Sequence, residues 1–125
     1  MTHLATVRGL FACALACLLV AQPAHAYQER IMATIARIGV TDEQQAGFDR
    51  IIDEHYVALR KMYTRQVREF GGSELEKQVN RGIRRLSTST EKKLTKVLRP
   101  EQMEEARYLL ELVGKQFRRD AGISE

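Results

Sequence analysis

The sequence of 125 residues contains no tryptophan and only two prolines and two cysteines. Both cysteines, Cys13 and Cys17, lie in the first 26 residues, so the rest of the chain supplies no disulfide and no cysteine metal ligand. His55 is the only histidine after residue 26, which argues against a histidine-rich metal site and against most catalytic triads. No phosphate-binding loop, nucleophile elbow or paired nucleophile and base is evident. The sequence therefore predicts no enzymatic activity, no cofactor and no bound metal.

The amino-terminal segment has the features of a signal peptide. Arg8 precedes an unbroken apolar run of eleven residues, Leu10–Val20, and Ala24-His25-Ala26 then supplies a small–x–small cleavage pattern. The run is too short to span a bilayer, which takes about 20 apolar residues. We therefore expect residues 1–26 to be a signal peptide, cleaved after Ala26, which leaves no transmembrane anchor. The mature chain, residues 27–125, would be a single periplasmic domain with nineteen Lys and Arg against sixteen Asp and Glu.

The mature chain is predicted to be all-α, with one short and three longer helices and no strand. Apolar residues recur at helical spacing over 27–38, 42–70 and 73–97, and again in a last helix that begins near Pro100. The second helix would be about 43 Å long at about 1.5 Å per residue, which exceeds the diameter of a compact globule of this size. We therefore expect an elongated, curved, antiparallel helical hairpin arrangement. The hydroxyls of Ser87–Thr90 compete for backbone hydrogen bonds, so the third helix can kink or break there.

Two helix starts share one short pattern. Val40-Thr41-Asp42-Glu43-Gln44 and Leu98-Arg99-Pro100-Glu101-Gln102 both have the form apolar–x–x–Glu–Gln. In the first copy Thr41 and Gln44 can form a capping box, in which the Gln side chain reaches back to the amide of the cap residue. In the second copy Pro100 suits the first helical position, but Arg99 offers no capping hydroxyl. The candidate motif and capping residues are Val40, Thr41, Gln44, Leu98, Pro100 and Gln102.

These segments resemble the paired LTxxQ motif of the Spy/CpxP family of small periplasmic proteins. Val40 replaces Leu in the first copy, and Arg99 replaces Thr in the second. The resemblance covers residues 27–120 and implies a thin, antiparallel, cradle-shaped dimer that works without ATP. The implied activity is to hold unfolded or misfolded envelope proteins, or to act as an envelope-stress adaptor on the periplasmic domain of a sensor kinase. The alternatives are a metal-resistance or metal-responsive protein of the same helical fold, and a structural or inhibitory envelope protein.

The third helix is strongly basic, because residues 74–99 carry eight Lys and Arg against three Glu. Six of these cations share the helix face opposite the apolar row, and we call them the basic stripe: Lys77, Arg81, Arg84, Arg85, Lys92 and Lys96. The stripe is either a solvated helix face or an electropositive surface that attracts acidic clients, a sensor domain or anionic lipid. Nucleic acid is not expected as a partner, because the chain is exported and no aromatic residues alternate with the basic ones.

The last helix has more apolar surface than one core-facing side requires. Tyr108, Leu109 and Leu112 project away from its main apolar row, so either a curved neighbouring helix covers them or they form a homodimer interface. A homodimer is favoured, because four thin helices bury little surface on their own. His55, within the apolar row of the second helix, is interpreted as a core or interface histidine rather than a ligand.

Overall fold

The computed structural model describes residues 23–124, and within that range the chain is helical and contains no strand. This confirms the predicted all-α fold. The elements are α2 (Pro23–Ile38), α3 (Asp42–Glu69), α4 (Gly72–Leu94), the 3-10 turn η1 (Pro100–Gln102) and α5 (Met103–Asp120). None of the helices described is both long and apolar enough to cross a membrane. The charged and apolar parts of the predicted signal peptide lie outside the described residues, and the predicted cleavage position falls in the first turn of α2.

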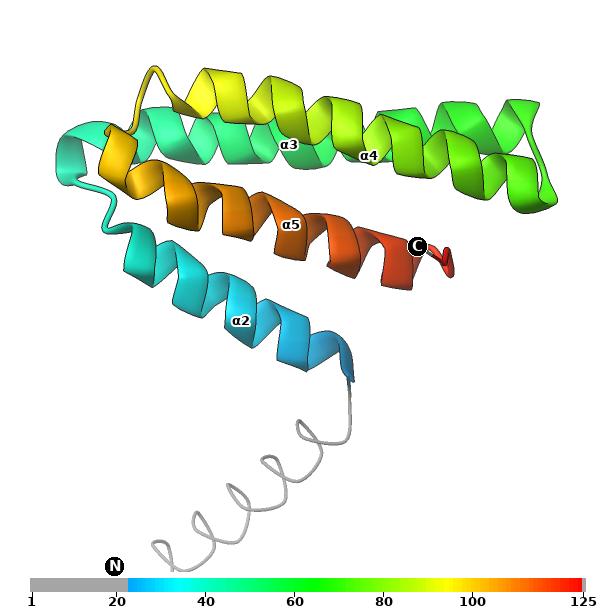
Figure 1. Ribbon diagram of the computed structural model, residues 1–125, viewed down its shortest axis with the longest axis horizontal. Coiled ribbons are helices and arrows are strands. Elements are labelled where there is room, and N and C mark those ends of the chain that lie inside the picture. Colours follow the sequence, from blue (N-terminus) through cyan, green and yellow to red (C-terminus); the bar gives the residue numbers. More distant parts are fainter. Residues whose placement is uncertain (1–22, 125) are drawn as a thin grey trace, which may run out of the picture.

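The helices converge at one end of the molecule and diverge from there (Figure 1). Helices α3 and α4 form a long antiparallel hairpin that turns at Gly71 and Gly72, and Gly72 has a φ of 56° that favours glycine. Helix α5 packs against α4 on one side and against α2 on the other. It is therefore the central helix of the fold.

Helix α4 runs without interruption from Gly72 to Leu94, so the chain does not break at Ser87–Thr90, a point that the sequence left open. Two hydroxyls of this segment form bonds that fit a regular helix. Thr88 Oγ1 donates to the carbonyl of Arg84 at 3.0 Å, one turn back. Thr90 is buried and bonds across to α3. Neither bond interrupts the helix.

The core is one cluster to which all four α-helices contribute. Two contacts show how closely the helices approach one another. A Cβ placed on Gly82 of α4 would lie 2.6 Å from Met62 Sδ of α3, so the absence of a side chain at Gly82 makes room for Met62. The rings of Tyr63 and Phe117 meet edge to face, with centroids 5.8 Å apart. These contacts join α3 to both α4 and α5.

The glutamines of the two motif copies bond to each other at the end where the helices converge. Gln44 Nε2 donates to Gln102 Oε1 at 2.9 Å, and Gln102 Nε2 donates to Gln44 Oε1 at 3.0 Å. Each side-chain oxygen also accepts the backbone N–H three residues earlier, from Thr41 at 3.0 Å and from Arg99 at 2.8 Å. The predicted bond from the Gln44 side chain to its cap residue is thereby confirmed, and Gln102 makes the same bond in the second copy.

The side-chain amide of each glutamine also lies within hydrogen-bond distance of backbone carbonyls just before the other copy of the motif. Gln44 Nε2 donates to the Val97 carbonyl at 3.1 Å. Gln102 Nε2 lies 3.2 Å from the Ile38 carbonyl and 3.1 Å from the Gly39 carbonyl. The two segments that look alike in sequence are thus placed reciprocally in space. They tie the α2–α3 junction to the junction between α4 and η1.

The remaining motif residues have simpler positions. Leu98 is buried in the core. Val40 is half-buried and packs against the core cluster. Pro100 occupies the first position of η1, where its missing N–H costs no helical hydrogen bond.

Candidate functional site

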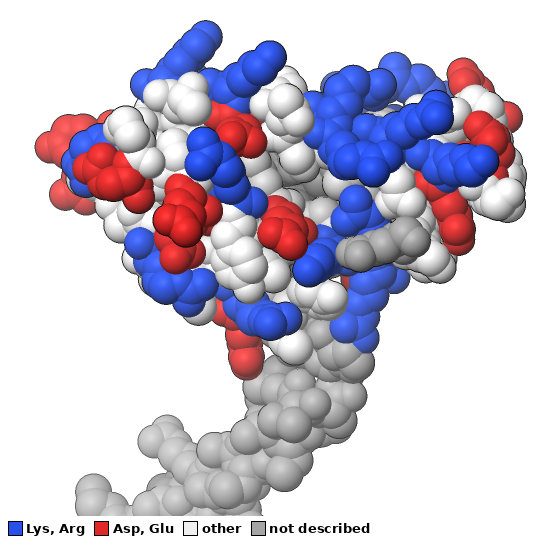
Figure 2. Space-filling model, in the orientation of Figure 1, with Lys and Arg blue, Asp and Glu red and all other residues white. Residues whose placement is uncertain are grey.

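All six residues of the basic stripe are exposed, five of them on α4 and Lys96 in the turn that follows Leu94, because α4 ends earlier than the predicted residue 97. Figure 2 shows Lys and Arg gathered over one half of the molecule, toward the turn between α3 and α4. The tertiary structure divides the stripe. Lys77, Arg81 and Arg84 line a groove between α4 and α5, whereas Lys96 lines a separate hollow between α3 and α4.

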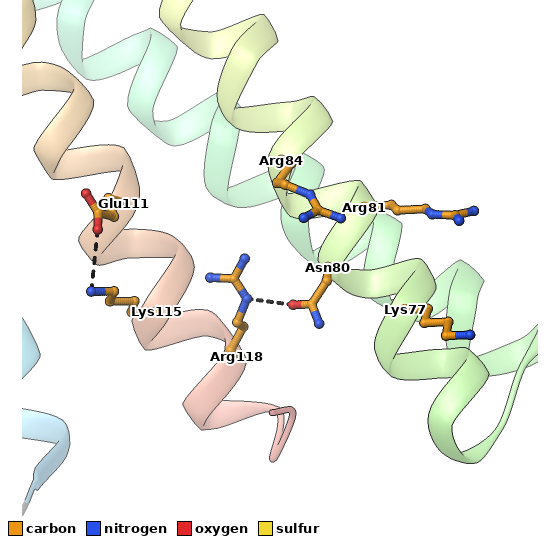
Figure 3. Close-up of a pocket in the computed structure, with 7 residues that line it drawn as sticks. All are labelled: Lys77, Asn80, Arg81, Arg84, Glu111, Lys115 and Arg118. Atoms are coloured by element: carbon orange, nitrogen blue, oxygen red, sulfur yellow. Dashed lines mark hydrogen bonds and ion pairs between the residues drawn. The ribbon is translucent and has the colours of Figure 1, made fainter. Parts of the chain in front are cut away.

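The groove between α4 and α5 receives side chains from both helices (Figure 3). Helix α4 contributes three cations of the stripe, and α5 contributes two more cations and one carboxylate. The volume of the groove is about 630 Å³. We call it the basic groove, and its lining residues are Lys77, Asn80, Arg81, Arg84, Glu111, Lys115 and Arg118.

Two contacts hold the α5 side of the groove in place. Arg118 Nε donates to Asn80 Oδ1 of α4 at 2.6 Å, which links the two walls. Lys115 Nζ lies 3.4 Å from Glu111 Oε1, one helical turn away on α5. The groove's single carboxylate therefore already faces one of its cations.

A second hollow continues the groove along the same two helices. It shares Arg84, Glu111 and Arg118 with the basic groove, and Ile83 and Leu110 are the buried apolar residues in its lining. On its rim Arg107 Nε donates to Glu91 Oε1 at 2.6 Å. The lining of this second part, with three arginines and two glutamates, is therefore less positive than that of the basic groove.

Sequence reasoning did not include Lys115 and Arg118 in the candidate site. Both are basic residues near the carboxyl end of α5, a position that favours cations by the helix dipole alone. Only the packing of α5 beside α4 brings them next to Arg81 and Arg84. No spacing along the sequence would have revealed this.

The proposed dimer residues on α5 have a different role. Leu109 is 1% exposed and Leu112 is 2% exposed, so both are part of the core of a single chain. Of the two alternatives, these two leucines fit the first, in which neighbouring helices cover them, because α5 lies between α4 and α2 and needs apolar residues toward both. Tyr108 is the exposed member of the three, at 37%.

His55 of α3 is buried, with 2% of its surface exposed, which confirms its interpretation as a core residue. Its Nδ1 lies 2.7 Å from Thr90 Oγ1 of α4, and its Nε2 has no hydrogen-bond partner among the described residues. Burial and, to a smaller extent, the nearby Lys93 ammonium lower the pKa of His55 from 6.5 to about 4. His55 is therefore neutral at physiological pH.

The part of the chain that the structure describes contains no group of three or more His, Cys, Asp or Glu side chains arranged to hold a metal ion. Comparison with protein-family models, with curated proteins and with solved structures finds no match for this chain. The charged surface of α4 and α5 is the feature of the described residues that points to a function.

Proposed function

We propose that this chain is a non-enzymatic periplasmic protein of Spy/CpxP type, which acts without ATP as a holding chaperone or envelope-stress adaptor. Cleavage after Ala26 is compatible with the fold, because the buried residues described in α2 are Ile31, Thr34 and Ile38, all beyond that position. Loss of residues 1–26 would leave these contacts intact. The reciprocal bonds of Gln44 and Gln102 support the idea that the two motif copies are functional counterparts.

The exposed basic stripe is the observation that carries the proposal. A summed positive field raises the rate at which acidic segments of an unfolded envelope protein, or an acidic face of a sensor domain, reach the surface. The large apolar residues exposed in the described range are Met32, Val57, Val67 and Tyr108, which belong to three different helices. Charge is therefore the main source of attraction, and apolar contacts are limited. Such binding would be weak, reversible and sensitive to salt.

Charge reversal tests this proposal. Changing Arg81, Arg84, Arg85 and Lys92 to Glu alters the net charge by −8 on an exposed face. A matched control reverses four exposed cations of α3 and alters the net charge by the same amount: Arg60, Lys61, Arg65 and Arg68. The measurement is suppression of aggregation of an acidic unfolded protein, without nucleotide and at low salt.

We expect the α4 reversal to slow client association and reduce protection, and the α3 reversal to have a smaller effect. Protection by the wild type should fall as salt rises from about 0.05 to about 0.5 M, because the screening length shortens from roughly 14 to roughly 4 Å. Circular dichroism should show that both variants stay helical, since exposed charges contribute little to stability. Undiminished protection by the α4 variant at low salt would refute the proposal.

A homodimer is part of the same proposal, but its interface cannot be formed by Leu109 and Leu112 while these residues fill the core. Sedimentation of the wild type at tens of micromolar should show a dimer. A monomer at that concentration would remove dimerisation from the proposal and leave the charge argument unaffected.

A further inference from the structure

The lining of the basic groove carries more positive than negative side chains. Five of its lining residues are cations and one is a carboxylate, which gives a local excess of four positive charges. Glu111 already faces Lys115. Among the described residues, no carboxylate forms an ion pair with Lys77, Arg81 or Arg84. An anion would therefore be attracted to this lining.

The cations of the groove come from both of its walls. Lys77, Arg81 and Arg84 follow at helical spacings of four and three residues, so they lie along one wall at about 6 and about 4.5 Å intervals. Arg118 comes from the other wall and reaches toward Asn80 and Arg84, and its Nε bond to Asn80 holds the side chain across the groove, whereas Lys77 and Arg81 extend away from α5 in the view of Figure 3. A ligand in the groove would therefore meet guanidinium groups from both α4 and α5.

We propose that the basic groove is a binding site for an anion that carries several phosphate groups. One phosphate monoester carries about −1.5 to −2 charges and three acceptor oxygens, so two or three phosphates would match the excess charge of the groove. Guanidinium groups bind phosphate with two parallel hydrogen bonds, which favours arginine at such a site. The groove contains three arginines: Arg81, Arg84 and Arg118.

A peptide rich in carboxylates fits the groove less well. Each carboxylate carries a single charge, and successive residues of an extended chain point to opposite sides. Matching four positive charges would take about four acidic side chains on one face, spread over roughly 20 Å or more. The α4 cations of the groove span only about 10 Å along the helix, from Lys77 to Arg84, which suits a compact, highly charged group better. This site is independent of the proposed chaperone activity, because it concerns a discrete groove and not the summed field of the stripe.

The primary test uses tripolyphosphate, titrated into the purified protein by calorimetry in a phosphate-free buffer at fixed ionic strength. The test variant is Arg81→Gln with Arg84→Gln. The matched control is Arg85→Gln with Lys92→Gln, which removes the same charge from the same stripe without changing a lining residue. All four side chains are exposed, so both variants should fold.

We expect wild type to bind tripolyphosphate and the groove variant to bind it at least about tenfold more weakly. The affinity of the control variant should differ from that of wild type by less than about threefold. Saturating tripolyphosphate should also raise the thermal midpoint of wild type by several degrees, since it binds only the folded state, and raise that of the groove variant less. Equal weakening in both variants would show a diffuse field and overturn the proposal. Failure of wild type to bind would overturn it as well.

Two sources of phosphate are distinguished by a vesicle assay. Phosphatidylcholine vesicles that contain phosphatidic acid present phosphate monoesters on a membrane, and phosphatidylglycerol vesicles of equal charge serve as the control. Sedimentation of wild type with the phosphatidic acid vesicles, displaced by tripolyphosphate, would assign a membrane-borne phosphate. Binding of tripolyphosphate without vesicle binding would assign a soluble ligand. Client protection is measured without phosphate, so a failure of either proposal leaves the other testable.

Discussion

Acidification should weaken the contact between α3 and α4 through a single side chain, His55. The neutral imidazole is buried, bonds to Thr90 and leaves Nε2 without a partner among the described residues. The positive charge of Lys93 on α4 contributes to the lowered pKa of His55. Lys93 Nζ itself lies 3.8 Å from Glu54 Oε2 of α3. No carboxylate is therefore bonded to the ring to stabilise a positive charge.

The magnitude follows from the difference in pKa between the folded and unfolded states. The folded pKa is about 4, and the ordinary value is 6.5. As pH falls below 6.5 the unfolded chain binds the proton first, so the folded state loses stability until the pH reaches about 4, below which both states are protonated. A difference of about 2.5 units corresponds to about 3 kcal/mol. That is a large part of the stability expected for a small domain, about 5–15 kcal/mol.

Urea denaturation between about pH 7.5 and about pH 4 measures this loss, with His55→Gln as the reference. Gln can keep a bond to Thr90 but does not titrate in this range. Carboxylates titrate in both proteins, so the difference between wild type and variant isolates the histidine. We expect the free energy of unfolding of wild type to fall by about 3 kcal/mol more than that of the variant. Parallel pH profiles for the two proteins would refute the reasoning.

Three further changes test the packing. Gln44→Ala should lower the free energy of unfolding by about 1–3 kcal/mol more than Thr41→Ala does, because it leaves several backbone and side-chain groups without partners. Equal shifts in urea midpoint for the two variants would contradict this. Leu109→Glu should abolish most of the helical circular dichroism signal, because it places a charge in the core, and a folded monomer would show that Leu109 is an interface residue. Thr90→Val should destabilise the protein by about 1–2 kcal/mol, because the bond to His55 Nδ1 is lost; calorimetry that finds no change would argue against that bond.

The helices themselves could be predicted from the sequence, because helical periodicity and end signals are local properties. Asp42–Glu69 begins and ends within one residue of the predicted range, since Thr41 and Gln44 mark its start and the glycines at 71 and 72 mark its end. The similarity of the two motif copies was also visible. Their reciprocal bonds were not, because a sequence pattern does not show which helix starts will meet.

Three features depended on the tertiary structure, and all three concern which helix lies beside which. Leu109 and Leu112 are buried because α5 has a neighbour on each side. The segment Ser87–Thr90 stays helical in part because Thr90 finds a partner on α3, which a local analysis of hydroxyl competition cannot include. The basic stripe was predictable from the spacing within α4, whereas the basic groove needs Arg118 of α5 and therefore exists only once α5 packs against α4. Periodicity fixes the faces of one helix, and packing decides what each face meets.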